Sequence, residues 1–296
     1  MDIDTIKSNL ERWGHFKHTG VFSRSDQIWL SSFAMDSPVV VDAVRSYQEF
    51  YSEELQRQTI RFHGRNPVLD GEVGPATIAM MNDRFCDVPD YAFDENGNPI
   101  LESNWPGSCR DAINTSYLFG GMNLSKELIR TAWERALRSW EAVIDVRFDL
   151  RTEFSRLDRI WATDGPLPGG TIAWSMLAQS NCNAKLEQRY DTLPTWSLSL
   201  LQKVICHEVG HALGSSHLSN REAIMNPSVG NALVPHAVDV ANMKRLGYGD
   251  PTSSPPSPPP PPVPNPAPGD LEIVDGKIDL RVAGQLVKLQ VIERAF

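Results

Sequence analysis

Apolar residues recur at helical spacing in three stretches near the N terminus. They fall every three or four positions over 3–13 and again over 39–50, where Ser37 and Pro38 offer a cap and a first turn. A further helix is predicted over 76–81, because Asp, Gly and Pro residues just before it form a turn signal. The first part of the chain is therefore expected to be a small all-α domain.

The middle of the chain mixes helical and strand periods. A helix is predicted from Ser125, with its apolar residues on one face, and residues 144–150 then alternate apolar and charged side chains as a half-buried strand. Ser197 is a candidate N-cap for a second helix. A helix that leads directly into a strand is typical of mixed domains, so we expect an α+β chain in which such a domain follows the all-α one.

The C-terminal part changes composition abruptly. Residues 251–268 are nearly all Pro and Ser, which indicates an extended, semi-rigid spacer. Alternating apolar residues between 271 and 291, with turn signals at 275–276 and 283–284, predict two or three short antiparallel strands. This segment is too short to hold a stable core alone, so it is expected to dock, to bind a partner or to be disordered.

Charge and hydropathy narrow the classes of partner. The formal net charge of −9 and the absence of a basic cluster argue against nucleic acid or an anionic membrane surface as the main partner. No stretch approaches the ~20 apolar residues of a membrane span. Residues 1–7 lack both a basic and an apolar region, so the sequence as written is expected to carry no secretory signal.

The four cysteines are Cys86, Cys109, Cys182 and Cys206. Four are too few for a disulfide scaffold in a chain of 296 residues, although one bridge between Cys109 and Cys182 is possible. The cysteines therefore leave the redox compartment open. Cys206 precedes a histidine on the predicted helix and is expected to be a core thiol.

Three of the seven histidines and one carboxylate fall within residues 207–217. On a helix, His207 and His211 project from the same face, so both can reach one ion at roughly 2.0–2.1 Å. Glu208 is better placed to bond a zinc-held water than to ligate. Gly214 permits a positive φ, so that the chain reverses and His217 returns as a third ligand. A fourth position stays open, as in catalytic zinc sites.

A bare H-E-x-x-H also occurs by chance on amphipathic helices, but Gly214 and His217 make the pattern far more specific. The stretch resembles the metzincin signature H-E-x-x-H-x-x-G-x-x-H. Residues 223–227 resemble the Met-turn of these enzymes, which implies that Met225 lies beneath the zinc ligands as packing support. The alternative for Met225 is an ordinary core methionine.

Residues 84–90, Arg-Phe-Cys-Asp-Val-Pro-Asp, resemble the cysteine switch PRCGxPD of the matrixins, the matrix metalloproteinase family. The resemblance implies that Cys86 occupies the open zinc position in a latent form. Phe85 stands where the family has Arg, which removes the partner of Asp90 unless Arg84 swings in from one residue earlier. The alternative for Cys86 is an ordinary buried cysteine.

The matrixin resemblance also implies a domain organisation. Residues 1–90 are similar to the peptidoglycan-binding-like helical fold of matrixin propeptides, and 91–104 form a connector. The zinc metallopeptidase domain spans 105–249, with a twisted, mostly parallel sheet, an active-site helix and a closing helix. A Pro-rich linker, 250–269, and a short β-rich tail, 270–296, follow.

Residues 164–175 resemble the matrixin edge strand above the active cleft. The resemblance implies that the backbones of Ile172 and Ala173 pair with substrate, a mode of binding that any sequence can use; the alternative is a plain edge strand. Trp174 and the run 189–191 stand where the family has histidine ligands of a structural zinc. We therefore expect one catalytic Zn²⁺ and no structural zinc, and calcium is doubtful for lack of carboxylate clusters.

The expected function is hydrolysis of peptide bonds by a latent zinc endopeptidase. His207, His211 and His217 hold the zinc, and Glu208 is the general base. The implied partners are protein or peptide substrates, with peptidoglycan or the cell surface as a further one, in an extracellular or cell-envelope location. One rival is a cell-wall-binding module whose zinc site acts on wall-associated proteins. Another is a non-catalytic, zinc-stabilised binding protein, against which the intact Glu208 argues.

Overall fold

The computed structural model describes residues 2–18, 34–52, 55, 69–91, 102–167, 170–228, 230 and 232–251, and the backbone of three strands between 271 and 289. The chain divides into two compact units, 1–256 and 257–296. Residues 252–268 of the expected Pro-rich spacer and the turns of the tail lie outside the described residues, as does most of the connector. No helix in the described ranges is both long and apolar enough to cross a membrane.

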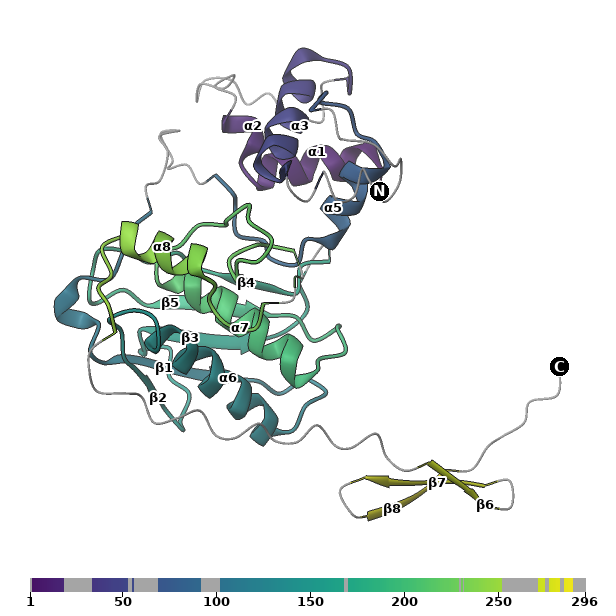
Figure 1. Ribbon diagram of the computed structural model, residues 1–296, viewed down its shortest axis with the longest axis vertical. Coiled ribbons are helices and arrows are strands. Elements are labelled where there is room, and N and C mark those ends of the chain that lie inside the picture. Colours follow the sequence, from purple (N-terminus) through teal and green to yellow (C-terminus); the bar gives the residue numbers. More distant parts are fainter. Residues whose placement is uncertain are drawn as a thin grey trace. The chain divides into compact units, whose positions relative to one another are not determined.

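Short helices form the start of the first unit and bury a core of their own (Figure 1). They are α1 (Ile3–Arg12), α2 (His15–His18), α3 (Pro38–Phe50) and α5 (Pro75–Asp83). The Asp2 side chain caps α1 by accepting from the Thr5 amide, and Pro38 opens α3 after Ser37, as predicted. Leu10 and Val44 are fully buried between these helices.

A five-stranded sheet dominates the rest of the first unit, in the order β2-β1-β3-β5-β4. Its strands are β1 (Ile113–Leu118), β2 (Phe148–Leu150), β3 (Ile160–Asp164), β4 (Ala173–Ser175) and β5 (Leu186–Tyr190). Neighbouring strands are parallel except at β4, an edge strand that runs antiparallel to β5. The expected mixed, mostly parallel architecture is confirmed.

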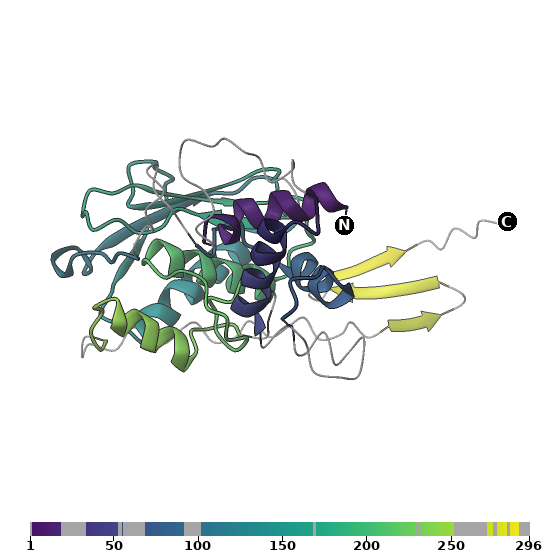
Figure 2. The same cartoon turned by 90° about the horizontal axis from the view of Figure 1, so that it is seen from above.

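Helices α6 (Lys126–Glu141) and α7 (Leu198–Ala212) lie side by side across one face of this sheet (Figures 1 and 2). Ser125 and Ser197 cap them by accepting from backbone amides three residues on. The Trp140 indole of α6 donates to the Cys206 carbonyl of α7 at 2.8 Å, inside the apolar core. The 3₁₀ turn η2 (Gly107–Cys109) precedes the sheet, and α8 (Ala237–Arg245) follows α7.

The strand predicted over 144–150 is shorter in the structure. Only β2 is extended, because the amides of Val143 and Ile144 still bond to the Trp140 carbonyl and the chain keeps turning after α6. Ile144 and Val146 are buried nonetheless, which explains their apolar character.

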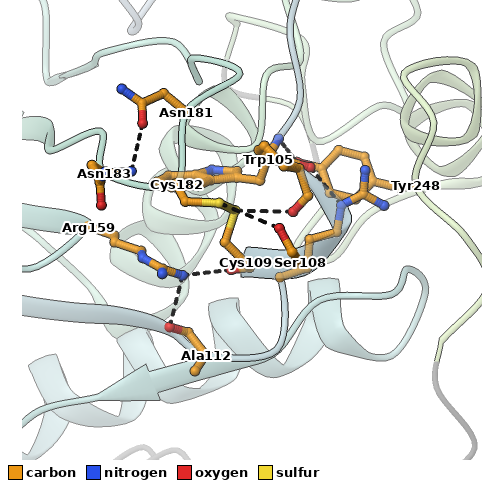
Figure 3. The surroundings of a disulfide bond; sticks show 11 residues. Trp105, Ser108, Cys109, Ala112, Arg159, Asn181, Cys182, Asn183 and Tyr248 are labelled. Carbon is orange, nitrogen blue, oxygen red and sulfur yellow. Dashed lines mark hydrogen bonds between the residues drawn. A yellow bond between two sulfur atoms is a disulfide. The ribbon is translucent and has the colours of Figure 1, made fainter.

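The one disulfide among the described residues joins Cys109 and Cys182 (Figure 3). It connects η2 to the loop before β5, with the two Cα atoms 5.6 Å apart. Arg159 donates to the Cys109 carbonyl at 2.7 Å beside it. The bridge that the sequence left open is therefore formed, whereas Cys86 and Cys206 are buried free thiols.

The second unit contains a three-stranded antiparallel sheet in the order β6-β7-β8, as the alternation predicted. The strands are β6 (Leu271–Val274), β7 (Lys277–Val282) and β8 (Gln285–Leu289).

Replacing Cys109 and Cys182 together by alanine is expected to lower the free energy of unfolding by about 4 kcal/mol, since the cross-link restricts the unfolded chain. The bridged residues are 73 apart in sequence, so the closed loop is long. Urea unfolding with and without reductant measures the effect. The wild-type midpoint should fall with reductant and the double variant should not respond; equal wild-type and variant midpoints without reductant would contradict the prediction.

Candidate metal centre

Helix α7 and the turn after it bring the predicted histidines together. His207, Glu208 and His211 lie in the last turns of α7 and are fully buried. Gly214 then adopts a φ of 104°, and a Cβ there would lie 1.6 Å from the Ser103 carbonyl oxygen. Only glycine fits this position, so Gly214 permits the reversal that returns His217 to the site.

The four proposed ligand atoms lie at the spacing of a tetrahedral site. Nε2 of His211 is 3.1 Å from Nε2 of His207 and 3.2 Å from Nε2 of His217. The Cys86 sulfur is 3.5 Å from the same nitrogen, and all four ligand atoms lie within 4.8 Å of one another. Two nitrogens bound tetrahedrally to zinc are separated by about 3.3 Å, and a nitrogen and a sulfur by about 3.5 Å. The residues present therefore fit zinc.

The Nδ1 atoms of the three histidines are all engaged on the other side of the rings. Nδ1–H of His207 donates to the Ile224 carbonyl and that of His211 to the Ser215 carbonyl, each at 2.7 Å. Nδ1 of His217 lies 2.7 Å from Oδ1 of Asp90. These acceptors fix the tautomer and leave Nε2 of each ring with a lone pair directed at the site.

Burial keeps these imidazoles neutral. It lowers the pKa of His207 and His211 well below the usual range, and their histidine neighbours add to the effect. Burial also lowers the pKa of His217 to about 3, although the Asp90 carboxylate opposes the shift. Neutral imidazole is the form that ligates metals, so the site is prepared for a cation.

Glu208 is the exceptional carboxylate of the site. It is fully buried, and within the described part of the chain neither of its carboxylate oxygens has a hydrogen-bond partner. Burial raises its pKa to about 8; the Cys86 thiol, near but outside hydrogen-bonding geometry, opposes the rise. Native structures rarely leave a buried carboxylate unpaired, and those that do so often use it in binding or catalysis.

The segment 84–87 bonds on one side to residues 172–173 and on the other side to Pro227, and these two stretches are called the walls of the site. The Phe85 amide donates to the Pro227 carbonyl at 2.9 Å, and the Ile172 amide donates to the Phe85 carbonyl at the same distance. The Asp87 amide donates to the Ala173 carbonyl at 3.3 Å. The two residues predicted to pair with substrate therefore pair here with the chain's own backbone.

Arg84 supplies the partner that Asp90 was expected to lack. Its Nη1 lies 2.9 Å from both Asp90 oxygens, and its guanidinium lies 4.4 Å from the centre of the Trp13 ring. Burial alone would raise the pKa of Asp90, but Arg84 and the surrounding donors hold it well below the usual range. Arg12 similarly pairs with Asp87 at 2.9 Å, which balances the anion beside the thiol.

Met225 packs closely against α7 at Gly210. A Cβ added at Gly210 would lie 2.2 Å from the Met225 sulfur, so the turn approaches the helix one residue before His211. Asp239 of α8 accepts from the amides of Ile224 and Met225 at 2.9 and 3.1 Å. Sequence reasoning missed this role of Asp239, whose only signal is its position near the start of a helix.

Within the described ranges, Cys86 and the three histidines are the one group of three or more His, Cys, Asp and Glu side chains that converges closely enough to hold an ion. Trp174 is half-buried on β4, and Tyr190 of β5 is buried with its hydroxyl donating to Gln188 at 2.9 Å.

Comparison with known proteins gives a family match and several curated relatives. The family model described as Matrixin matches residues 112–246. The chain is 27% identical to stromelysin-2 of Rattus norvegicus over 65% of its length and 38% of the relative's. It is 29% identical to interstitial collagenase A of Mus musculus, over 61% of this chain and 39% of that protein. For hatching enzyme of Paracentrotus lividus the identity is 23%, and the shares are 76% and 35%.

The chain therefore spans less than half the length of these three relatives. A match over 76% of this chain is longer than the whole stretch from residue 112 to the C terminus. The similarity thus extends to residues before the family-model match.

Gly210→Ala tests the contact between α7 and Met225. The added methyl would overlap the methionine sulfur and approach Trp140, so we expect a loss of stability of about 1–3 kcal/mol and weaker zinc binding. Thermal unfolding and zinc titration measure these effects. Gly120→Ala is the control, because its Cβ would meet nothing within 4 Å; equal losses in both variants would contradict the prediction.

Proposed function

We propose that residues 112–246 form a matrixin-like metzincin catalytic domain, which cleaves peptide bonds within proteins as a zinc-dependent endopeptidase. One observation carries the proposal: three neutral histidines direct Nε2 at one point beside a buried, unpaired carboxylate. A purely structural zinc site has no need of such a carboxylate. The zinc-stabilised binding protein is therefore the weaker alternative.

His207, His211 and His217 would hold the zinc, which when bound supplies Lewis acidity toward a peptide carbonyl and toward water. Glu208 would accept a proton from the attacking water, because its carboxylate lies near the Cys86 thiol and has no hydrogen-bond partner that competes for it. It then delivers that proton to the leaving amine nitrogen.

Main-chain groups on both walls would bind the substrate. The Ile172 amide, the Ala173 carbonyl and the Pro227 carbonyl bond to the segment 84–87 in this structure. Once that segment leaves, the same three groups are free to pair with an extended peptide, whose side chains they do not read. Substrate selection is therefore left to the surrounding side chains.

The described form is proposed to be latent. Cys86 lies where a fourth ligand belongs, and its flanking backbone bridges both walls, so a substrate cannot enter while the segment is docked. Residues 1–90 would act as the propeptide and 91–104 as the connector in which activating cleavage occurs. Two facts support this proposal: the helices bury a separate core, and the similarity to hatching enzyme of Paracentrotus lividus extends before residue 112.

An oxidising compartment is proposed for the folded protein, either extracellular or in the cell envelope. The Cys109–Cys182 disulfide supports this location, because such bonds persist where thiols are not kept reduced. We further propose one zinc ion per chain, which metal analysis of the purified protein measures directly.

Glu208→Ala is expected to lower the rate of peptide hydrolysis by about 10²–10⁴-fold while zinc stays bound, because the base is lost and the ligands are kept. Hydrolysis and metal content are measured after limited proteolysis has released the segment 84–90. The control is Glu134→Ala, which breaks a partly exposed ion pair with Arg130 and should leave the rate unchanged. Retained hydrolysis in zinc-loaded Glu208→Ala would refute the assignment.

Arg84→Met is expected to loosen the docked segment. The Arg84–Asp90 pair is buried, and removing one partner of a buried pair costs about 3–5 kcal/mol. The Cys86 thiol should therefore react with a thiol reagent at least ~100-fold faster than in the wild type, and uncleaved protein should show peptidase activity. Arg45→Met, which breaks an exposed pair with Asp42, is the matched control. If the Cys86 thiol of Arg84→Met reacted as slowly as that of the wild type, this would contradict the proposal that the Arg84–Asp90 pair holds the segment docked.

A further inference from the structure

The three candidate zinc ligands differ in what holds their outer nitrogens. His207 and His211 donate to the backbone carbonyls of Ile224 and Ser215, which belong to the same domain as the ligands. Nδ1 of His217 instead meets a carboxylate oxygen of Asp90, which lies 127 residues earlier in the chain. The other atom near this nitrogen is Nη2 of Arg84 at 3.4 Å, and a guanidinium can only donate. Asp90 is therefore the acceptor.

Asp90 is held in place from the helical side. Its side chain and that of His217 are fully buried. The Tyr51 hydroxyl donates to Oδ1 at 2.6 Å, and Nε2 of His15 lies 2.8 Å from Oδ2. Tyr51 follows α3 and belongs to the core that the N-terminal helices bury, and His15, which begins α2, packs edge-on against Tyr47 of that core. A continuous buried network thus joins that core to one candidate zinc ligand.

We propose that Asp90 is a positioning residue of the zinc site, which supplies the acceptor that orients His217 for the metal. The helical region then does more than cover the site, because it completes the hydrogen bonding of one ligand. The inference rests on the proposed zinc binding but not on the proposed peptidase activity. It also distinguishes Asp90 from Cys86, which would contribute an atom to the metal itself.

The contact matters for zinc binding because the Asp90 side chain is charged. A carboxylate acceptor makes an imidazole a stronger ligand than a carbonyl does, and loss of such a partner typically weakens metal binding 10–100-fold. Because binding equilibria are reciprocal, zinc stabilises the docked segment by as much as the docked segment stabilises zinc. Release of the segment would therefore leave His217 without its acceptor and the zinc more weakly held.

Asp90→Asn in the full-length chain tests the inference. Zinc affinity, measured by competition with a chelator, should fall 10–100-fold, because the amide keeps the shape of the side chain but not its charge. Asp42→Asn is the matched control, because it removes the charge of an exposed carboxylate in α3 that pairs with Arg45, so its zinc affinity should stay within about twofold of the wild type. Equal affinity in Asp90→Asn and wild type would overturn the inference.

A second measurement needs no variant and decides the case in which Asp90→Asn also exposes Cys86. In zinc-loaded wild-type protein, nuclear magnetic resonance resolves the ring protons on Nδ1 of the three ligands. The His217 proton should resonate furthest downfield and be protected from exchange, because it bonds to a buried carboxylate. A His217 proton no further downfield than those of His207 and His211, or one exchanging freely with water, would overturn the inference.

The two measurements test the role of Asp90 separately from the proposed endopeptidase activity. A chain that shows these zinc affinities and signals but hydrolyses no peptide would refute the endopeptidase and leave the role of Asp90 intact. A chain that cleaves peptides without the His217 signal would do the reverse.

Discussion

Three lone pairs that face one another set the central constraint on this fold. Each candidate ligand donates its Nδ1 proton outward, so Nε2 of His211 lies 3.1 and 3.2 Å from Nε2 of His207 and His217 with no proton to share. Burial keeps all three rings neutral, and they repel unless a cation lies between them. The surrounding structure holds this arrangement: Gly214 provides the reversal, and Asp239 secures the turn that carries the Ile224 carbonyl.

The segment 84–90 also contacts the three candidate ligands. It brings the Cys86 sulfur to the ligand cluster, a backbone that bonds to both walls, and a carboxylate that meets His217. The buried Arg84–Asp90 pair links these contacts to the helical core. The proposed metal binding and latency would thus be coupled to the packing of the N-terminal helices through a few side chains, and a change in one is expected to alter the others.

The eleven-residue motif was predictable because its geometry is local. Two histidines four apart on a helix face one way, and Gly214 accounts for the return of the third. Long-range partners were not predictable: nothing in the spacing of Asp90 and His217 indicates their contact. Strands β1, β3 and β5 were also missed, because buried polar residues such as Thr115 and Gln188 interrupt their apolar alternation. The sequence left open whether Arg84, which lies one residue before the family's Arg position, pairs with Asp90. Only the three-dimensional packing could decide this.

The central claim is that the chain holds one zinc ion by three histidines while its own cysteine fills the fourth position. X-ray absorption at the zinc edge of the intact, zinc-loaded protein tests this claim most directly. The account predicts one sulfur neighbour at about 2.3 Å and three nitrogen neighbours at about 2.0–2.1 Å. A spectrum with only nitrogen and oxygen neighbours would show that Cys86 does not ligate the metal and would contradict the account.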